Sequence, residues 1–227
     1  MTSISLSVVE KDGSRTPISL EVQEILLAGY TGRDRAEVLK HIGELQQLGV
    51  APPPQVPMVY VIEPELITVD GIVSVKADQT SGEVEFCLAP SPLGLLVGVA
   101  SDHTDREQEA IDVTASKRLC PHPVSREVWR YDDIRDHWDS IQVRSWAVSG
   151  DTRQAYQDGR LDAFMSVDAL TSELARQGHG DLEGRIVFGG TLPTTDGFIF
   201  AHRFEAQLHD PLLGRTLTCA YDVSVEP

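Results

Sequence analysis

Apolar side chains follow two different periods along the chain. Between residues 34 and 48 they recur every three or four positions, at Val38, Ile42 and Leu45, which is typical of an amphipathic helix. Asp34 can cap the start of this helix, and Gly49 can end it. We therefore expect a helix over residues 34–48.

Most other apolar segments alternate with period two, which is typical of strands, and Gly, Pro and Asp separate them. The predicted strands cover residues 4–10, 18–22, 58–62, 72–76, 83–88, 95–100, 141–148, 185–188, 198–208 and 216–225, and a second helix is predicted over residues 167–176. The last two strands flank a turn and form an antiparallel hairpin. Strands outnumber helices and no regular βαβ alternation is visible, so we expect a mixed α/β, mainly β fold.

No repeat, low-complexity tract or Gly/Ser linker divides the 227 residues. A single domain over residues 1–227 is therefore expected. Residues 1–30 form its N-terminal strands, and residues 31–50 form a helical segment.

Charge and cysteine content narrow the possible partners. Nineteen basic against thirty-five acidic residues give a formal charge of −16, which argues against nucleic-acid and membrane-surface partners. The longest apolar run, residues 93–100, is too short to cross a bilayer. Three widely spaced cysteines and an N-terminus without a signal-peptide pattern favour the cytoplasm. An anionic substrate would need a local cation or metal to offset the repulsion from the protein's net negative charge.

Three acidic residues lie close to two predicted strands. Glu83 and Glu85 share one face of their strand, because alternate side chains point the same way. Taken alone, this pair indicates a solvated outer face. Asp102 follows the next strand, where a dense polar segment begins. Three carboxylates without a convincing Cys/His set favour a hard ion such as Mg²⁺ or Mn²⁺ over zinc.

Three further segments are candidates for chemistry. Lys117, one of four lysines, precedes a Pro-rich loop and could equally be a surface counter-ion. Gly189 and Gly190 precede Thr191, and such glycines let a backbone approach a ligand or simply make a turn. Residues 136–139, which include His137, also invite a metal-binding interpretation. We expect them instead to form a polar strand edge with His137 hydrogen-bonded locally.

Read in order, these segments resemble the fumarylacetoacetate hydrolase superfamily. The resemblance covers roughly residues 28–200 and is carried by five segments: His41-Ile42-Gly43-Glu44 resembles its His-x-x-Glu motif, Glu83-Val84-Glu85 its Glu-x-Glu strand, Ser101-Asp102-His103-Thr104-Asp105-Arg106-Glu107 its Asn-Asp-x-Ser/Thr-Ala-Arg-Asp segment, Ser116-Lys117 before Cys120-Pro121 its lysine stretch, and Gly190-Thr191-Leu192-Pro193 its Thr-Gly-Thr-Pro turn.

Several positions depart from the family pattern and indicate a divergent branch. Ser101 replaces the usual Asn, and Asp105 replaces the usual Ala. Gln108 comes one residue earlier than the family's glutamine. Residues 58–62 lack the lysine often found in that strand. These changes concern substrate identity and leave the three carboxylates in place.

The resemblance implies a mixed β-sheet roll or sandwich with short helices and a helical lid formed by residues 31–50. It also implies that Glu83, Glu85 and Asp102 hold one Mg²⁺ or Mn²⁺ ion. Such an ion leaves open positions for a small organic acid. A homodimer is implied as well.

The resemblance also assigns catalytic and substrate-binding roles. His41 and Glu44, three residues apart on one helix, would activate a water molecule, although an exposed helical His is most often only solvated. Lys117 would stabilise an oxyanion or enolate. Thr191 and Arg106 are the implied substrate-binding residues, and Arg106 also suits bracing the acidic cluster.

Together these features predict a divalent-metal-dependent hydrolase that cleaves a C–C bond in a small 2-oxo acid or β-dicarbonyl compound, such as an acylpyruvate, through a metal-stabilised enolate. The same site could serve a decarboxylase, hydratase or tautomerase, which the sequence does not separate. A non-catalytic organic-acid-binding protein is the competing class, and Ser101 and Asp105 favour it. A metallophosphoesterase is less favoured, because two-metal sites need more ligands. The roles of His103, Asp105 and His137 stay open.

Overall fold

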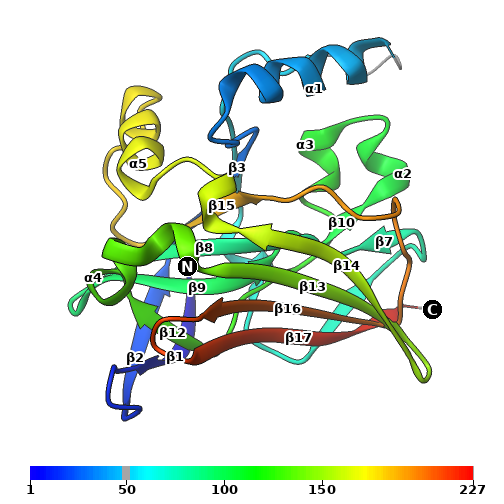
Figure 1. The fold of residues 1–227 in the computed structure, drawn as a ribbon. Coiled ribbons are helices and arrows are strands. Elements are labelled where there is room, and N and C mark those ends of the chain that lie inside the picture. Colours follow the sequence, from blue (N-terminus) through cyan, green and yellow to red (C-terminus); the bar gives the residue numbers. More distant parts are fainter. Residues whose placement is uncertain (48–51, 227) are drawn as a thin grey trace.

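The larger of two main sheets has eight strands. The computed structural model describes residues 1–47 and 52–226, and the strand order in this sheet is β2-β1-β12-β9-β8-β15-β3-β4 (Figure 1). Its strands are β1 (Thr2–Val9), β2 (Arg15–Val22), β3 (Glu24–Gly29), β4 (Met58–Ile62), β8 (Val84–Ser91), β9 (Gly94–Ser101), β12 (Glu127–Arg130) and β15 (Arg185–Thr191). β1 and β12 are parallel, as are β3 and β15. The other neighbouring pairs are antiparallel, so the sheet is mixed.

The second main sheet has the order β14-β13-β16-β17-β6, and the pairs β10-β7 and β11-β5 form separate two-stranded sheets. These strands are β5 (Ile67–Thr68), β6 (Ile72–Val75), β7 (Thr80–Ser81), β10 (Thr104–Asp105), β11 (His122–Pro123), β13 (Gln142–Ser149), β14 (Thr152–Arg160), β16 (Arg203–Asp210) and β17 (Arg215–Val225). The predicted C-terminal hairpin is confirmed by β16 and β17. The prediction of a mixed, mainly β fold is also confirmed.

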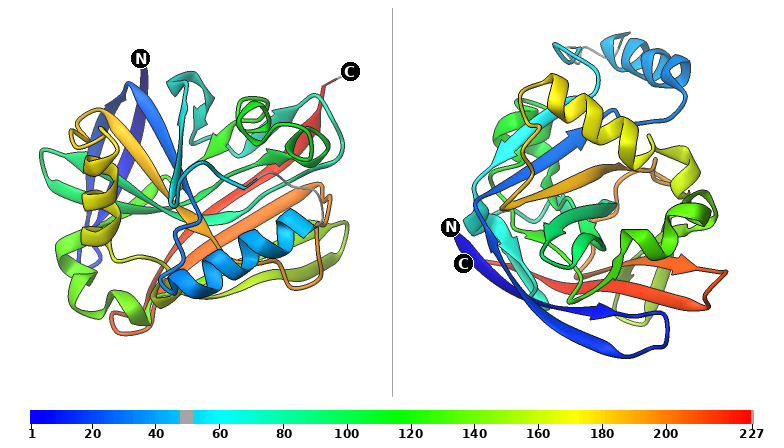
Figure 2. Two further views of the ribbon diagram at one scale, coloured as in Figure 1. Left: turned by 90° about the horizontal axis from the view of Figure 1, so that it is seen from above. Right: turned by 90° about the vertical axis from the view of Figure 1, so that its left-hand side faces the viewer.

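The helices are short, apart from two. They are α1 (Arg35–Gln47), α2 (Arg106–Glu109), α3 (Val113–Ser116), α4 (Tyr131–Ile134) and α5 (Val167–Arg176), together with the 3-10 helices η1 (Pro64–Leu66), η2 (Arg135–Ser140) and η3 (Leu161–Ala163). α1 and α5 lie on the side of the molecule away from the β16–β17 hairpin (Figures 1 and 2). No helix within the described ranges is both long and apolar enough to span a membrane.

Both predicted helices are confirmed. The Oδ1 atom of Asp34 accepts a hydrogen bond from the amide of Ala36 at 2.8 Å and caps α1. The predicted stop at Gly49 lies outside the described residues. Ser166 caps α5, since its Oγ accepts from the amide of Ala169 at 3.2 Å. Among the side chains described in α1, Ile42 is the buried one, so this helix makes little contact with the core.

Strand β8 is buried on both faces. Phe86 and Leu88 belong to the apolar cluster between the two main sheets, which also takes Phe204 from β16. Cys87 and Ala89 point the other way, into a second apolar cluster that the N-terminal strands help to line. Glu85 shares this second face, because alternate residues of a strand point the same way.

The strand predictions were wrong in two respects. Strands β3, β12 and β14 were missed, as were the two-residue strands β5, β7, β10 and β11. The strand predicted from residue 198 begins only at Arg203. β3 has a run of four buried side chains, residues 25–28, instead of an alternating pattern. Such runs are typical of strands covered on both faces. Phe198 lies outside the sheet, with the guanidinium carbon of Arg106 4.2 Å from its ring centroid.

Candidate functional site

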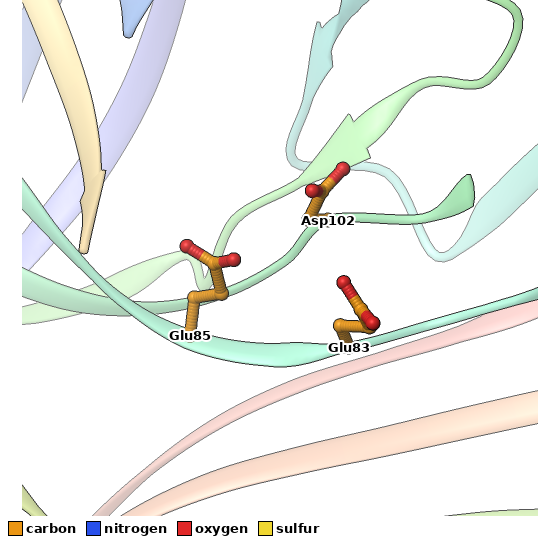
Figure 3. A group of neighbouring side chains, drawn as sticks. All are labelled: Glu83, Glu85 and Asp102. Atoms are coloured by element: carbon orange, nitrogen blue, oxygen red, sulfur yellow. The ribbon is translucent and has the colours of Figure 1, made fainter. Parts of the chain in front are cut away.

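The β8–β9 hairpin brings three carboxylates together. Val84 pairs with Ser101 in the antiparallel register, so Glu83, just before β8, lies opposite Asp102, just after β9. The amide of Asp102 donates to the carbonyl of Glu83 at 3.0 Å. One carboxylate oxygen each from Glu83, Glu85 and Asp102 lies within 4.8 Å of the others (Figure 3).

These carboxylates are not on a solvated face. Glu85 and Asp102 are only 4% and 3% exposed, and Glu83 is half-buried. The outer-face interpretation of the Glu83–Glu85 pair was therefore wrong, because both faces of β8 are covered. Buried carboxylates need compensating cations or protons. The basic side chains near the three carboxylates lie close to Asp102 and Glu83 but not to Glu85.

Lys117 and Arg106 are the cations at this cluster. The buried Nζ of Lys117 lies 2.6 Å from Oδ2 of Asp102 and 3.9 Å from Oε2 of Glu83. The Nη2 of Arg106 lies 3.2 Å from Oε1 of Glu83, and its Nε donates to Ser81 at 2.8 Å. Lys117 is therefore not a surface counter-ion. The donors of Arg106 are engaged by the protein, which fits its bracing role.

Glu85 has no such cation. Its Oε2 accepts a hydrogen bond from the amide of Gly190 at 2.8 Å, and no basic side chain among the described residues lies within 4.0 Å of it. Burial, followed by the nearby charge of Asp102, raises the pKa of Glu85 well above its ordinary value.

The pKa values of the other two carboxyl groups move in opposite directions. Burial raises the pKa of Glu83, although Arg106 and Lys117 lower it in part. Burial would also raise the pKa of Asp102, but Lys117 and then His122 outweigh it, so this pKa falls below its usual range. The cluster has its strongest cation at Asp102 and a deficit of positive charge at Glu85.

A fourth carboxylate, Glu109, was missed by sequence reasoning. Its Oε2 lies 2.7 Å from Nη1 of Arg106, and its Oε1 lies 3.5 Å from Nζ of Lys117. It stands one residue after Gln108, where the family pattern places its glutamine. The available signal in the sequence was this mismatch with the family pattern, because Glu109 occupies the position where the family has its glutamine.

Thr191 lies at the edge of the cluster and is held by the protein. Its Oγ1 donates to the carbonyl of Val84 at 2.9 Å and accepts from Nε2 of Gln157 at 2.8 Å. Gly190 before it has a φ of 98°, a conformation that favours glycine. An added Cβ there would lie 2.0 Å from Oγ1 of Thr31. The glycine therefore lets the chain turn closely enough for its amide to reach Glu85.

His41 and Glu44 lie on α1, but their side chains fall outside the described residues. Their predicted water-activating role stays a prediction. α1 begins three residues after Gly32, whose backbone bridges to Phe164, so the helix is anchored at its N-terminal end.

His103, Asp105 and His137, whose roles the sequence left open, make hydrogen bonds to other protein groups. The ring of His103 lies between the hydroxyls of Tyr221 and Thr80, each 2.9 Å away. Asp105 caps α2 by accepting from the amide of Gln108 at 2.9 Å. His137 lies in η2 and not on a strand edge, which corrects that expectation.

The donor set fits a hard divalent cation. Three carboxylate oxygens in reach of one point are the ligands that Mg²⁺ or Mn²⁺ takes, usually together with water or substrate oxygens. The charge deficit at Glu85 is what a cation would offset. Glu83, Glu85 and Asp102 would hold the ion, and Lys117 would remain beside it.

Solved structures that share this fold include fumarylacetoacetate hydrolase family proteins. Yeast ynq8, a member of that family, is 16% identical with a TM-score of 0.61, covering 91% of this chain and 95% of its own. A proposed fumarylpyruvate hydrolase from Burkholderia cenocepacia is 17% identical with a TM-score of 0.62, covering 99% and 96%. A 2-keto-3-deoxy-D-arabinonate dehydratase is 14% identical with a TM-score of 0.61, covering 91% and 74%.

At such low identities the similarity shows a common fold, and the predicted resemblance is confirmed for the fold. The model of a protein family of unknown function, DUF2848, matches residues 28–221, so the chain belongs to this family. A search of the curated proteins finds no match.

Proposed function

We propose that this chain is a Mg²⁺- or Mn²⁺-dependent enzyme that hydrolyses a C–C bond in a small 2-oxo acid or β-dicarbonyl compound. The observation that carries the proposal is the cluster of Glu83, Glu85 and Asp102, whose carboxylate oxygens lie within 4.8 Å of one another. A chelating 2-oxo acid matches such a site, because its two oxygens can occupy the open positions of a bound ion. The whole chain, residues 1–227, would form one catalytic domain.

When bound, the ion supplies Lewis acidity toward the substrate carbonyl and stabilises developing enolate charge. The protein's own groups do the rest. His41, oriented by Glu44, takes a proton from water, which attacks the carbonyl carbon. The C–C bond breaks, its electron pair passes to the enolate, and the enolate then takes a proton. Lys117 adds positive charge beside that enolate.

Arg106 holds Glu83 and Glu109 in place, and Thr191 fixes the turn that carries the Gly190 amide. The main hydrogen bonds of Arg106 and Thr191 are made to other protein groups. Each side chain would therefore contact substrate only with the atoms that these hydrogen bonds leave accessible. Helix α1 would close over the site and exclude water as substrate binds.

Hydrolysis is preferred over the related reactions because the resemblance includes the His-x-x-Glu spacing at His41 and Glu44. A decarboxylase, hydratase or tautomerase would use the same carboxylates without that dyad. The fumarylpyruvate hydrolase and dehydratase neighbours each support one of these outcomes.

The test is turnover by the Mg²⁺-loaded protein of an acylpyruvate, oxaloacetate and a 3-deoxy-2-oxo sugar acid, with product release followed by chromatography. Pyruvate and a carboxylic acid from the acylpyruvate support the hydrolase. Product from oxaloacetate or the sugar acid alone would move the assignment to decarboxylation or dehydration. Ligand-induced thermal stabilisation without any product would make the protein a binder.

The homodimer and the cytoplasmic location are part of the same proposal. The three cysteines are free and buried, which suits a reducing compartment. Light scattering coupled to size-exclusion chromatography gives the oligomeric state directly.

A further inference from the structure

Phe198 is an exposed aromatic residue beside the acidic cluster. It belongs to residues 192–202, which connect β15 to β16 and pass α2 (Figure 1). One face of its ring stacks on the guanidinium of Arg106, and the same guanidinium contacts Glu83 and Glu109. Phe198 is nevertheless 52% exposed. The ring therefore lies one side chain away from the cluster, with much of its apolar surface facing solvent.

The segment that carries Phe198 is attached to the protein on both sides of the ring. Before it, the amide of Thr195 donates to the carbonyl of Tyr156 at 2.9 Å, and its Oγ1 donates to the carbonyl of Ala155 at 3.2 Å. After it, Ile199 packs against the apolar cluster between the two main sheets. The position of Phe198 is therefore set by these anchors as well as by its contact with Arg106.

The cluster is most accessible on the side where Phe198 lies. The side chains of Glu109 and Glu83 are 24% and 15% exposed. Those of Asp102 and Arg106 are only 5% and 4% exposed. Arg106 bridges the two more exposed carboxylates and stacks on Phe198. A molecule that reaches the cluster from solvent on this side would pass the free surface of the ring.

The same side offers no unpaired cation to a second negative charge. Lys117 and Arg106 are the lysine and arginine that pair with the cluster in the described part of the chain, and each already contacts two or more carboxylates. Together with a divalent ion they balance the four carboxylates when all are ionised. A second carboxylate on the substrate would come close to Glu109 without a cation of its own, which opposes its binding.

We propose that Phe198 is a specificity-determining residue that contacts the substrate's acyl tail, and that this tail is uncharged and apolar. The inference rests on the proposed function and narrows its substrate to acylpyruvates that carry an alkyl or aryl acyl group. The tail would cover the exposed surface of the ring, and both apolar surfaces would leave water. Apolar contacts of this kind discriminate between substrates by about 10-fold or more.

The first test compares kcat/KM of the Mg²⁺-loaded full chain for three acylpyruvates. Hexanoylpyruvate has a pentyl tail, succinylpyruvate has a tail of similar size that ends in a carboxylate, and acetylpyruvate has only a methyl group. We expect wild type to prefer hexanoylpyruvate over succinylpyruvate by about 10-fold or more.

Substitutions assign this preference to the ring. Phe198→Ala should lower kcat/KM for hexanoylpyruvate about 10-fold, mainly through KM, and change acetylpyruvate by less than about 3-fold. Phe198→Leu keeps an apolar side chain and should restore most of the loss. Leu212→Ala is the control, because Leu212 is an exposed apolar residue between β16 and β17, outside the site. It should leave all three substrates unchanged.

A binding measurement gives a second readout that does not depend on cleavage. 2-Oxononanoate and 2-oxoheptanedioate have the same two tails but lack the second carbonyl that C–C hydrolysis requires. Titration calorimetry on the Mg²⁺-loaded protein should give the same order of affinity, and Phe198→Ala should remove it. Thermal unfolding checks that this variant is folded, which we expect because the ring is exposed.

The outcomes separate this inference from the proposed function. Cleavage of acylpyruvates with equal or better use of succinylpyruvate, or with a preference that Phe198→Ala leaves intact, would overturn the inference and keep the hydrolase. An altered oligomeric state of Phe198→Ala in light scattering would assign the ring to an interface between copies and also overturn it. Binding of 2-oxononanoate through Phe198 without any cleavage would support the inference and overturn the hydrolase. Neither cleavage nor binding would overturn both.

Discussion

Glu85→Gln should change metal binding and metal-free stability in opposite directions. The substitution keeps the size of the side chain and its acceptor for the Gly190 amide, which lies 2.8 Å from Oε2 in the wild type. It removes one negative charge from a buried cluster. Without metal, the negative charge of Glu85 lowers the stability of the folded protein. With metal bound, the Glu85 carboxylate would be one of the ligands.

The size of the stability gain follows from the separation of the carboxylates. The carboxylate oxygens lie within 4.8 Å of one another, and two unit charges at that limit repel by roughly 3.5 kcal/mol at an effective dielectric constant of about 20. Glu85 faces two such neighbours, and Lys117 and Arg106 offset most of this repulsion. We expect a net gain of about 1–3 kcal/mol in the free energy of unfolding of the metal-free protein, or about 3–9 °C in Tm.

The loss of metal affinity should exceed about 100-fold, because even groups that only orient a ligand are worth 10- to 100-fold. Urea unfolding of chelator-treated protein and Mn²⁺ calorimetry measure the two effects. Glu107→Gln is the control, since Glu107 is exposed and bonds to Gln79 outside the cluster. A Glu85→Gln variant that is less stable without metal, or that binds Mn²⁺ like wild type, would refute the reasoning.

Lys117→Met should destabilise the protein by about 3–5 kcal/mol in urea unfolding, because it leaves the buried Asp102 without its cation; unchanged stability would contradict the ion pair. His41→Ala should lower acylpyruvate hydrolysis by about 100-fold or more and leave Mn²⁺ affinity unaltered, and a full hydrolysis rate would exclude His41 as the base. Asp210 has a pKa held below its ordinary value, since hydrogen bonds from Leu213 and His137 outweigh its burial. Its stabilisation is therefore complete above its unfolded pKa and is lost as pH falls through the folded one. Asp210→Asn should cost about 1.5–3 kcal/mol at pH 7 and much less at pH 3, and an equal cost at both would rule this out.

The elements predicted best were those whose signals are local. α5 has the predicted bounds because Ser166 and the apolar spacing of residues 167–176 act within the helix itself. The β16–β17 hairpin was predictable for the same reason. The short connection between β8 and β9 likewise placed Glu83, Glu85 and Asp102 near one another.

The parts that were missed depend on residues far away in the sequence. β3 pairs in parallel with β15, whose residues lie about 160 positions later, as in the register of Ile25 with Ile186. Nothing in the local pattern of β3 reveals that partner. The surroundings of His122 were hidden in the same way, because Phe188 and Asp102 come close to it only in the folded chain.

The central claim is that Glu83, Glu85 and Asp102 share one hard cation. The most direct measurement is an anomalous difference map from a crystal of the full chain soaked in Mn²⁺. We predict a single strong peak at about 2.1 Å from one oxygen of each carboxylate. A map with no peak there, or with Mn²⁺ bound only at other carboxylates, would contradict the account.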